Sequence, residues 1–356
     1  MRRMSMRERI LAVLRGRPLD RVPFVQYDGL AAPNDEIWSA VGRNNMGLLH
    51  WTAVHRVEHC DCRIETEEFE RGGLRGIRSV MHTPVGSLTQ EKLRQPTYDA
   101  PIVREPFVKE PGDYRVLAAY LGDAVVCDDV ERFLRDDRDL GDDGIPLTAI
   151  GVTPYQQMWK WWTGIENLAF HLVDCPDLVH ECMSLIAATQ RRVFEIVRRA
   201  PVPFADFTDN ITASMVGDKY FRRYCVPFYD ELAGMLADRD VPVFVHMDGD
   251  LKPLWEAIGE SGVGGIDSFS PPPDNDTSAG QAVAMWPRMR LFLNFPSSVH
   301  LAPPEKVYAK AMEILQEAGH TGRLQIQISE NVPPGVWRSS YPQIVRAIAD
   351  FGPPAG

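Results

Sequence analysis

VPVFVHMDGD, residues 241–250, is a short apolar run that ends in an imidazole and two carboxylates. The apolar part does not alternate between polar and apolar residues. Runs of this kind are typical of parallel strands that are covered on both faces. The segment therefore predicts a buried parallel strand with a polar group of side chains at its carboxyl end.

Similar runs recur along the chain. The other predicted strands are residues 22–26, 146–151, 203–207, 265–269, 291–294 and 324–329. Patterns typical of helices lie between them, for example at residues 165–172, 176–200, 218–237, 251–260 and 303–318. Alternation of strand and helix predicts βαβ units. No GxGxxG turn follows the first strand, so the pattern favours a (β/α)8 TIM barrel over a dinucleotide-binding sheet.

Residues 63–94 interrupt this alternation. Residues 63–70 alternate between polar and apolar positions, Arg71-Gly72-Gly73 forms a turn signal, and residues 74–81 run back. We expect an early β-hairpin insertion here. The 27 glycines and 28 prolines are spread along the chain and mark no linker. The sequence therefore predicts one barrel domain over residues 1–356.

The composition excludes several classes of protein. Among 356 residues, 38 are Lys or Arg and 49 are Asp or Glu, which gives a formal charge of −11. Nucleic-acid binders and binders of anionic membranes need a basic surface, which argues against both. No apolar stretch is long enough to span a bilayer, and no signal peptide is expected. Six cysteines in a chain of this length indicate reduced thiols, so we expect a cytoplasmic protein.

Polar side chains follow most of the predicted strands. Functional groups of a barrel lie at the carboxyl ends of its strands, so we expect these side chains to converge. The candidates are Tyr27, Asp28, Tyr155, Asp209, Asn210, His246, Asp248, Asn294 and Glu330.

His246 and Asp248 form the most specific pair. Their i, i+2 spacing behind a strand lets both face the barrel mouth, where they can hold a divalent cation or act as an acid–base dyad. Glu330 behind the last strand offers a third ligand. The alternative is that Asp248 or Asp250 caps the next helix and that His246 is a core residue.

Two other candidates also have structural interpretations. Asp209-Asn210 is equally consistent with a helix cap or an Asx turn. Tyr155 either lines a site for a flat ligand or packs against the barrel.

Several segments together resemble the uroporphyrinogen decarboxylase superfamily, in order and over nearly the whole chain. They are residues 7–16, 20–23, 83–89, 107–114, 226–229, 246–249, 295–298 and 330–334. The resemblance implies a (β/α)8 barrel and often a homodimer. The superfamily holds two main chemistries, which are metal-free decarboxylation of a porphyrinogen and zinc-dependent methyl transfer to or from a corrinoid.

The chain differs from the true porphyrinogen decarboxylases and is closer to the corrinoid-dependent methyltransferases. The decarboxylases have an Arg-rich substrate loop after the first strand, whereas residues 27–36 contain no Arg. The methyltransferases bind zinc with a His-x-Cys pair and a later Cys. By position, His246 keeps the histidine, and Asp248 and Glu330 replace the two cysteines. A histidine with two carboxylates is a harder site, which suits an oxygen ligand.

The resemblance thus implies a metal-assisted methyltransferase that moves a methyl group from a small, O-methylated substrate to a corrinoid (cobalamin) protein. His246, Asp248 and Glu330 are the expected ligands of a divalent metal, zinc first. If no metal binds, Asp209 or Asp248 is the expected general acid. The remaining candidates, including Asp209, are expected to orient the substrate: Tyr27, Asp28, Tyr155, Asn210 and Asn294.

Two alternatives stay open. One is a metal-independent decarboxylase or lyase acting on a small acid or a tetrapyrrole, which needs a cation for the carboxylate. Arg21, Arg222 and Arg223 are the candidates for that cation. The other is a non-catalytic barrel that holds a corrinoid or tetrapyrrole.

Overall fold

A computed structural model describes residues 2–96, 100–330 and 332–354. Its contacts divide the chain into two compact units. The barrel unit comprises Met1–Val54, Asp129–Gly151 and Val197–Gly356, and the insert unit comprises His55–Asp128 and Val152–Ile196. A single folding domain over residues 1–356 stays a prediction.

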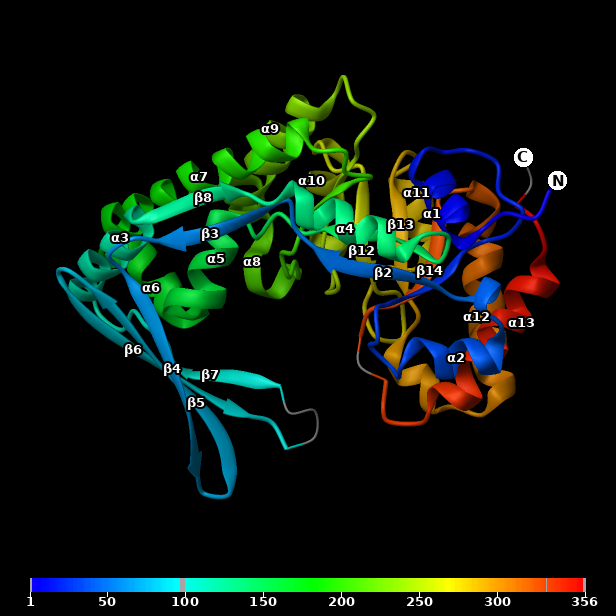
Figure 1. Ribbon diagram of the computed structural model, residues 1–356, viewed down its shortest axis with the longest axis horizontal. Coiled ribbons are helices and arrows are strands. Elements are labelled where there is room, and N and C mark those ends of the chain that lie inside the picture. Colours follow the sequence, from blue (N-terminus) through cyan, green and yellow to red (C-terminus); the bar gives the residue numbers. More distant parts are fainter. Residues whose placement is uncertain (1, 97–99, 331, 355–356) are drawn as a thin grey trace. The chain divides into compact units, whose positions relative to one another are not determined.

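The barrel unit contains one sheet of eight strands, all paired in parallel (Figure 1). In sheet order, they are β10 (Ala205–Phe207), β11 (Val243–Val245), β12 (Gly265–Phe269), β13 (Arg290–Asn294), β14 (Leu324–Ile328), β1 (Phe24–Tyr27), β2 (Gly47–Thr52) and β9 (Gly144–Thr148). A parallel bridge between Ala149 and Asp206 joins the two ends of the sheet. The expected (β/α)8 TIM barrel is confirmed.

All seven predicted strands overlap observed ones, and β2 was missed. Its sequence is GLLHWT, and its last half carries the half-exposed His50 and the 40% exposed Trp51. A strand that is buried at one end and exposed at the other shows neither the apolar run nor the alternation that sequence patterns detect.

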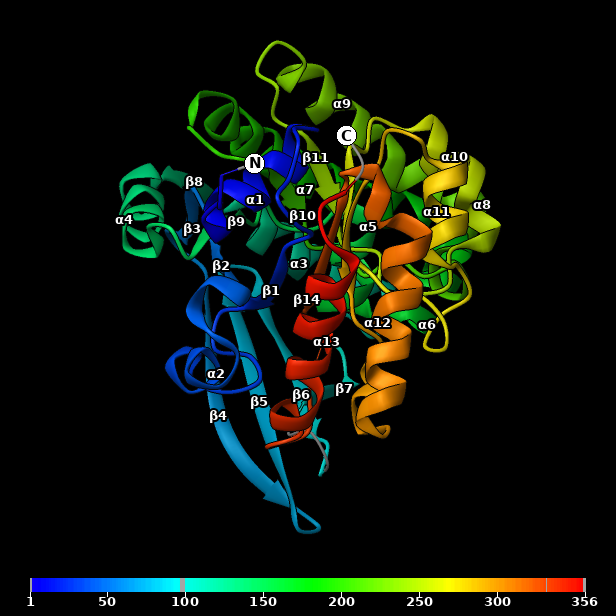
Figure 2. The ribbon, with the colours of Figure 1, turned by 90° about the vertical axis from the view of Figure 1, so that its right-hand side faces the viewer.

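Helices alternate with the barrel strands. They are α1 (Met6–Leu14), α2 (Asn34–Val41), α4 (Val130–Leu140), α8 (Ala213–Tyr220), α9 (Val226–Leu236), α10 (Trp255–Glu260), α11 (Ala279–Met285), α12 (Pro304–Ala318) and α13 (Trp337–Phe351). Short 3-10 turns occur at Arg43–Asn45, Lys252–Leu254, Ser297–Leu301 and Gly319–Thr321, and a π-helical turn, η4 (Phe221–Cys225), joins α8 to α9. Figure 2 shows α12 and α13 side by side. No helix among the described residues is long and apolar enough to cross a membrane.

The barrel interior is filled by aromatic side chains. Phe204, Phe244 and Phe292 pack against one another with ring centroids 4.8–5.7 Å apart. Ile10 and Val13 of α1 belong to the same buried cluster. Because α1 covers this end with apolar side chains, the interior is a packed core that supports the opposite, polar end.

The insert unit is built on antiparallel strands. β3 (His55–His59) pairs with β8 (Ala124–Asp128), and a second sheet contains β4 (Arg63–Arg71), β5 (Leu74–Thr83), β6 (Gly86–Arg94) and β7 (Pro101–Glu105). Its helices are α3 (Tyr114–Gly122), α5 (Pro154–Gln157), α6 (Ile165–Asp174) and most of α7 (Pro176–Arg199), with a 3-10 turn at Pro111–Asp113 and the π-helical turn η3 (Met158–Thr163).

The predicted hairpin is confirmed and is part of this larger insertion. Gly72 and Gly73 form the turn between β4 and β5 with φ values of +59° and +76°. Both angles lie in the left-handed region, which glycine adopts without steric cost.

Candidate functional site

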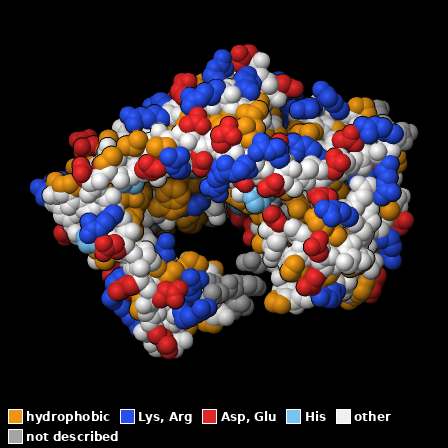
Figure 3. Space-filling model, viewed as in Figure 1, with side chains coloured by type: hydrophobic (Ala, Val, Ile, Leu, Met, Phe, Trp, Pro, Cys, Tyr) orange, Lys and Arg blue, Asp and Glu red, His pale blue; other side chains and the backbone are white. Residues whose placement is uncertain are grey.

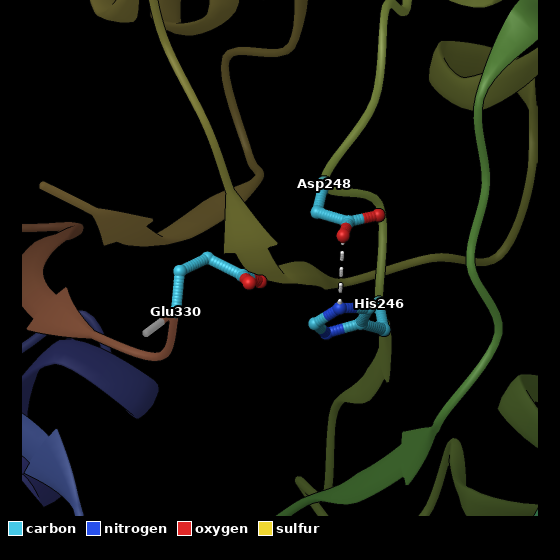
Figure 4. Close-up of side chains that lie close together, drawn as sticks. All are labelled: His246, Asp248 and Glu330. Atoms are coloured by element: carbon cyan, nitrogen blue, oxygen red, sulfur yellow. Dashed lines mark ion pairs between the residues drawn. The ribbon is translucent and has the colours of Figure 1, made fainter. Parts of the chain in front are cut away.

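Three predicted ligands converge at the carboxyl end of the barrel strands. His246 follows β11, Asp248 lies two residues later, and Glu330 follows β14. One ligand atom from each side chain lies within 4.8 Å of the others. Figure 4 shows the three side chains pointing toward one another. The convergence expected from the sequence is therefore observed for these three residues.

The His246 ring is held from two sides. The backbone N–H of Ser268 donates to Nδ1 at 3.1 Å, and Nε2 lies 3.6 Å from Oδ2 of Asp248. A ring that accepts a hydrogen bond at Nδ1 carries its hydrogen on Nε2 when neutral. In this geometry, His246 therefore presents an N–H to Asp248.

The carboxylates around His246 favour its protonation. Burial acts to lower the pKa of His246, but the pairing with Asp248 and the charges of Asp267 and Asp206 raise the pKa to about 9. A second proton on Nδ1 would remove the acceptor of the Ser268 N–H. The bond to Ser268 therefore opposes the protonation that the surrounding carboxylates favour.

Glu330 is an unusually basic carboxyl group. Burial raises its pKa, and the negative charge of Asp248 raises it further. Two carboxylates that face each other in a partly buried site are destabilised unless a proton or a cation lies between them. Either a proton or a cation would therefore relieve the repulsion between Asp248 and Glu330.

The loop that carries Asp248 is fixed by its neighbours. The side chain of Asn275 donates to the backbone oxygen of Asp248, and the Gly249 N–H donates to the backbone oxygen of Ile211 at 3.3 Å. A Cβ on Gly249 would lie 2.1 Å from Cβ of Thr212. Only glycine fits this close approach of the backbone, so the loop conformation depends on it.

The helix-cap alternative for Asp248 and Asp250 is not observed. The backbone N–H groups of Leu251 and Lys252 donate instead to the carboxylate of Asp276, at 2.9 Å for Leu251. Asp276 therefore caps the start of this helical segment, and Oδ2 of Asp248 lies 3.6 Å from Nε2 of His246.

A layer of buried polar side chains lies inside the barrel, and it was not among the predicted sites. The carboxylate of Asp267 on β12 accepts hydrogen bonds from Gln327 on β14 and from the hydroxyl of Tyr27, the latter at 2.8 Å. Asp206 on β10 is fully buried, and neither of its oxygens has a hydrogen-bond partner among the described residues. The Tyr27 hydroxyl, predicted to bind substrate, is thus engaged in this layer.

Asp206 and Asp267 share a low-dielectric environment. Burial raises the pKa of Asp206 well above its ordinary value, and the charge of Asp267 raises it further. Burial also raises the pKa of Asp267, but its hydrogen bonds to Gln327 and Tyr27 counteract the effect. Asp206 is therefore the carboxyl of the two that loses its proton less readily.

Asp209 and Asn294 are buried, and both accept hydrogen bonds. The Tyr229 hydroxyl donates to Asp209 at 2.6 Å. Asn294 accepts from the backbone N–H and the hydroxyl of Ser329 at 3.0 and 3.1 Å. Asn294 thereby ties β13 to the residue that precedes Glu330, so the structure gives it a positioning role.

Of the remaining predicted residues, Asp28 and Asn210 belong to the barrel unit and Tyr155 belongs to the insert unit. Asp28 binds Nδ1 of His50 and the amide of Asn34, each at 2.7 Å. Asn210 is exposed. Tyr155 is buried in α5 of the insert unit. Substrate contacts of these residues stay predictions.

The donor set fits a hard divalent cation, provided that the ligand atoms are free of protons. One imidazole and two carboxylates are ligands suited to zinc and similar ions. Coordination through Nε2 leaves the ring's one hydrogen on Nδ1, so the hydrogen bond from the Ser268 N–H must break, and any further proton on His246 or Glu330 must be lost. Binding of an ion is therefore coupled to release of protons.

A family model described as uroporphyrinogen decarboxylase matches residues 91–349. The chain belongs to this family. Among solved structures, a methyltransferase from Methanosarcina mazei is similar with a TM-score of 0.57 and 13% sequence identity, covering 98% of this chain and 99% of that chain. An L-Ala-D/L-Glu epimerase matches with a TM-score of 0.24 and 10% identity, covering 84% of this chain and 82% of that chain, which supports no conclusion. No curated protein matches the sequence.

Proposed function

We propose that this member of the uroporphyrinogen decarboxylase family is a metal-assisted methyltransferase that moves a methyl group from a small O-methylated substrate to a corrinoid protein. The observation that carries the proposal is the convergence of His246, Asp248 and Glu330 within 4.8 Å at the carboxyl end of the barrel. The structural similarity to a protein described as a methyltransferase supports it.

The donor set favours an oxygen-bound methyl group over a sulfur-bound one. Two carboxylates and an imidazole make a harder site than thiolates do, and hard ions prefer oxygen ligands. A divalent ion, zinc first, would supply Lewis acidity toward the ether or phenolate oxygen of the substrate.

The surrounding residues orient this site. Asn275 fixes the Asp248 loop, and Asn294 fixes the turn before Glu330. Partners of this kind set the direction of ligand side chains and are needed for affinity. Asp209, held by Tyr229, is the proposed group for orienting the substrate from β10.

The proposal includes a separate corrinoid (cobalamin) protein as methyl acceptor, a homodimeric enzyme and a cytoplasmic location. A methyl group that leaves an oxygen atom needs a strong nucleophile, and no side chain of the site supplies one. The acceptor must therefore come from a partner that reaches the barrel mouth.

A metal-independent lyase is the second candidate. The feature that favours it is the buried Asp206, whose raised pKa suits the proton donor that such a reaction needs. It also needs a cation for the substrate carboxylate. Arg222 forms ion pairs with Asp218, Glu256 and Glu260, and Arg21 donates to the backbone oxygen of Asn44. The guanidinium of Arg223 lies over the ring of Tyr224. These contacts favour methyl transfer over the lyase.

Metal analysis tests the first half of the proposal. Protein equilibrated with zinc and then dialysed should retain about one ion per chain, and His246→Ala should retain none. His320→Ala is the matched control, because His320 is exposed and lies outside the cluster. Equal metal content in all three proteins would exclude His246 as a ligand.

Corrinoid spectroscopy tests the second half. With cob(I)alamin and a panel of methoxylated phenols, the zinc-loaded protein should convert the cob(I)alamin spectrum into that of methylcobalamin. His246→Ala should lose this activity at least 100-fold, and His320→Ala should keep it. Retained metal without any methyl transfer would leave a metal protein of another activity and contradict the proposed function.

A further inference from the structure

The insert unit contains a cavity of about 370 Å³ that lies within that unit alone. It is lined by Val57, His59, Tyr120, Leu121, Ala124, Gln157, Trp161, Trp162, Ile186 and Thr189. These residues come from β3, α3, β8, α5, η3 and α7. Figure 3 shows hydrophobic side chains gathered over the region of α5 and η3, below β3 in that view.

The walls of this cavity are aromatic. His59 stacks on Tyr120 with ring centroids 4.1 Å apart and an interplanar angle of 21°. Trp162 meets Tyr120 edge-on at 5.6 Å, and Trp161 meets Trp162 edge-on at 6.3 Å. Rings arranged in this way offer both faces and edges, which are the surfaces that a flat aromatic group contacts best.

The cavity carries no counter-charge for an ion. None of its lining residues is Asp, Glu, Lys or Arg. Burial lowers the pKa of His59, although the carboxylate of Asp123, 3.7 Å from Nδ1, acts in the opposite direction. His59 is therefore neutral at neutral pH, and a charged ligand would lose its hydration without compensation.

We propose that this cavity, called here the aromatic pocket, binds a neutral, flat aromatic or heteroaromatic small molecule of one or two rings. A volume of about 370 Å³ lies at the lower end of the range for small-molecule sites. The amide of Gln157 and the hydroxyl of Thr189 lie among the lining groups and can bind one uncharged polar substituent. The lining residues of the pocket belong to the insert unit, and the His246–Asp248–Glu330 cluster belongs to the barrel unit.

Exposure of its rim favours a ligand from solution. Trp161 is 40% exposed and Val57 is 44% exposed, whereas Trp162 is 6% exposed. The pocket thus has an open rim and a buried wall. A flat ring can enter edge-first and bury its faces against the indole and phenol rings.

A pair of probes with the same skeleton tests the proposal directly. 2-Naphthol is flat, aromatic and neutral at pH 7, and decahydro-2-naphthol has the same skeleton without aromatic rings. Equilibrium dialysis against the full chain should give one binding site for 2-naphthol with a Kd at least tenfold lower than that of the saturated analogue. Equal affinities, or no binding of 2-naphthol, would overturn the proposal.

Two neighbouring substitutions on α7 locate the site. Thr189→Phe places a ring in the pocket and should weaken binding of 2-naphthol at least tenfold. Ala188→Phe is the matched control, because Ala188 is the exposed neighbour outside the lining and its replacement should leave the Kd unchanged. Unchanged binding by Thr189→Phe would contradict the assignment.

A second pair of variants tests the proposal if Thr189→Phe does not fold. Trp161→Ala removes a partly exposed wall and should weaken binding at least threefold, whereas Phe170→Ala, at a 68% exposed ring of the same unit, should not. His246→Ala should bind 2-naphthol like the wild type, since it changes the barrel unit only. If size-exclusion chromatography instead showed that Thr189→Phe and Trp161→Ala dissociate an oligomer and neither changes the Kd, the pocket would be an interface and the proposal would fail.

Discussion

The two ring nitrogens of His246 have different partners. Nδ1 accepts from the Ser268 N–H, and Nε2 faces Asp248. The ring is therefore oriented before any ion binds, but Nε2 carries the ring hydrogen, which must move to Nδ1 when an ion binds there. Burial and the charge of Asp248 raise the pKa of Glu330, so protons also compete for this ligand.

Metal affinity should therefore rise with pH. The carboxylates around His246 raise its pKa to about 9, and burial raises the pKa of Glu330, so protons compete with the ion for both groups as the pH falls. Between pH 6 and pH 8, the Kd for zinc should fall about tenfold per pH unit for each proton released. Competition titration with a chromophoric chelator measures this dependence. A Kd that stays constant over this range would show that neither group binds the ion.

Asp206 should make the fold less stable as pH rises. Its pKa in the folded state is raised, so the native state binds more protons than the unfolded state above about pH 4. The free energy of unfolding should then fall by about 1.4 kcal/mol per pH unit for this one proton. Urea unfolding of wild type and Asp206→Asn from pH 5 to pH 7 measures the difference. In Asp206→Asn, the free energy of unfolding should fall less steeply with pH than in the wild type. Equal dependence on pH in both proteins would mean that Asp206 is ionised in the folded protein.

Single residues were predictable where the strand pattern ended. His246, Asp248 and Glu330 follow apolar runs, and the convergence of strand ends in a barrel places them together. Asp206 and Asp267 were missed because they lie within strands, where one polar residue in an apolar run is not distinctive. Gln325 and Gln327 alternate along β14, and this period of two was the available signal for a polar interior.

At the scale of elements, the loop after β11 places Asp248. It is anchored at three points: the backbone of Ile211, the side chain of Asn275, and Asp276 at its end. Its geometry requires the close contact between Gly249 and Thr212.

Gly249→Ala should displace this loop. The new Cβ would lie 2.1 Å from Cβ of Thr212, so we expect a loss of about 1–3 kcal/mol in the free energy of unfolding and weaker metal binding. Gly234→Ala is the control, because Gly234 is exposed in α9 with open space around it and should gain up to about 1 kcal/mol. Denaturant unfolding and metal titration of both variants decide between these outcomes, and a Gly249→Ala variant that binds zinc like the wild type would contradict this role.

Elements were predictable to the extent that each formed one continuous pattern. The helix predicted at 218–237 begins directly after Gly217, whose φ of +63° kinks α8. It then continues through a π-helical turn into α9, because that turn shifts the helix register without changing the apolar pattern. The hairpin was readable from its glycine turn, whereas the rest of the insert unit joins segments far apart in the sequence.

At the scale of the whole molecule, the candidate metal ligands lie at one end of the barrel. α1 and the phenylalanine cluster fill the other end, so that an ion bound at His246, Asp248 and Glu330 would join β11 to β14. An ion that links two strands of the sheet stabilises the folded state, since the unfolded chain does not present this site.

Zinc should therefore raise the stability of the whole protein. At a free concentration 100 times its Kd, an ion that binds only the native state adds about 2.7 kcal/mol to the free energy of unfolding. Thermal unfolding with zinc, and again after addition of a chelator, should show a reversible rise and fall of Tm. No shift of Tm at saturating zinc would mean that the ion does not bind the native fold.

The central claim is that His246, Asp248 and Glu330 form one metal site, and the most direct test compares two carboxylates of one loop. Asp248 belongs to the cluster, and Asp250 is exposed and lies outside it. Metal content per chain should be about one for wild type and Asp250→Asn and near zero for Asp248→Asn. Equal metal content in Asp248→Asn and Asp250→Asn would contradict the claim.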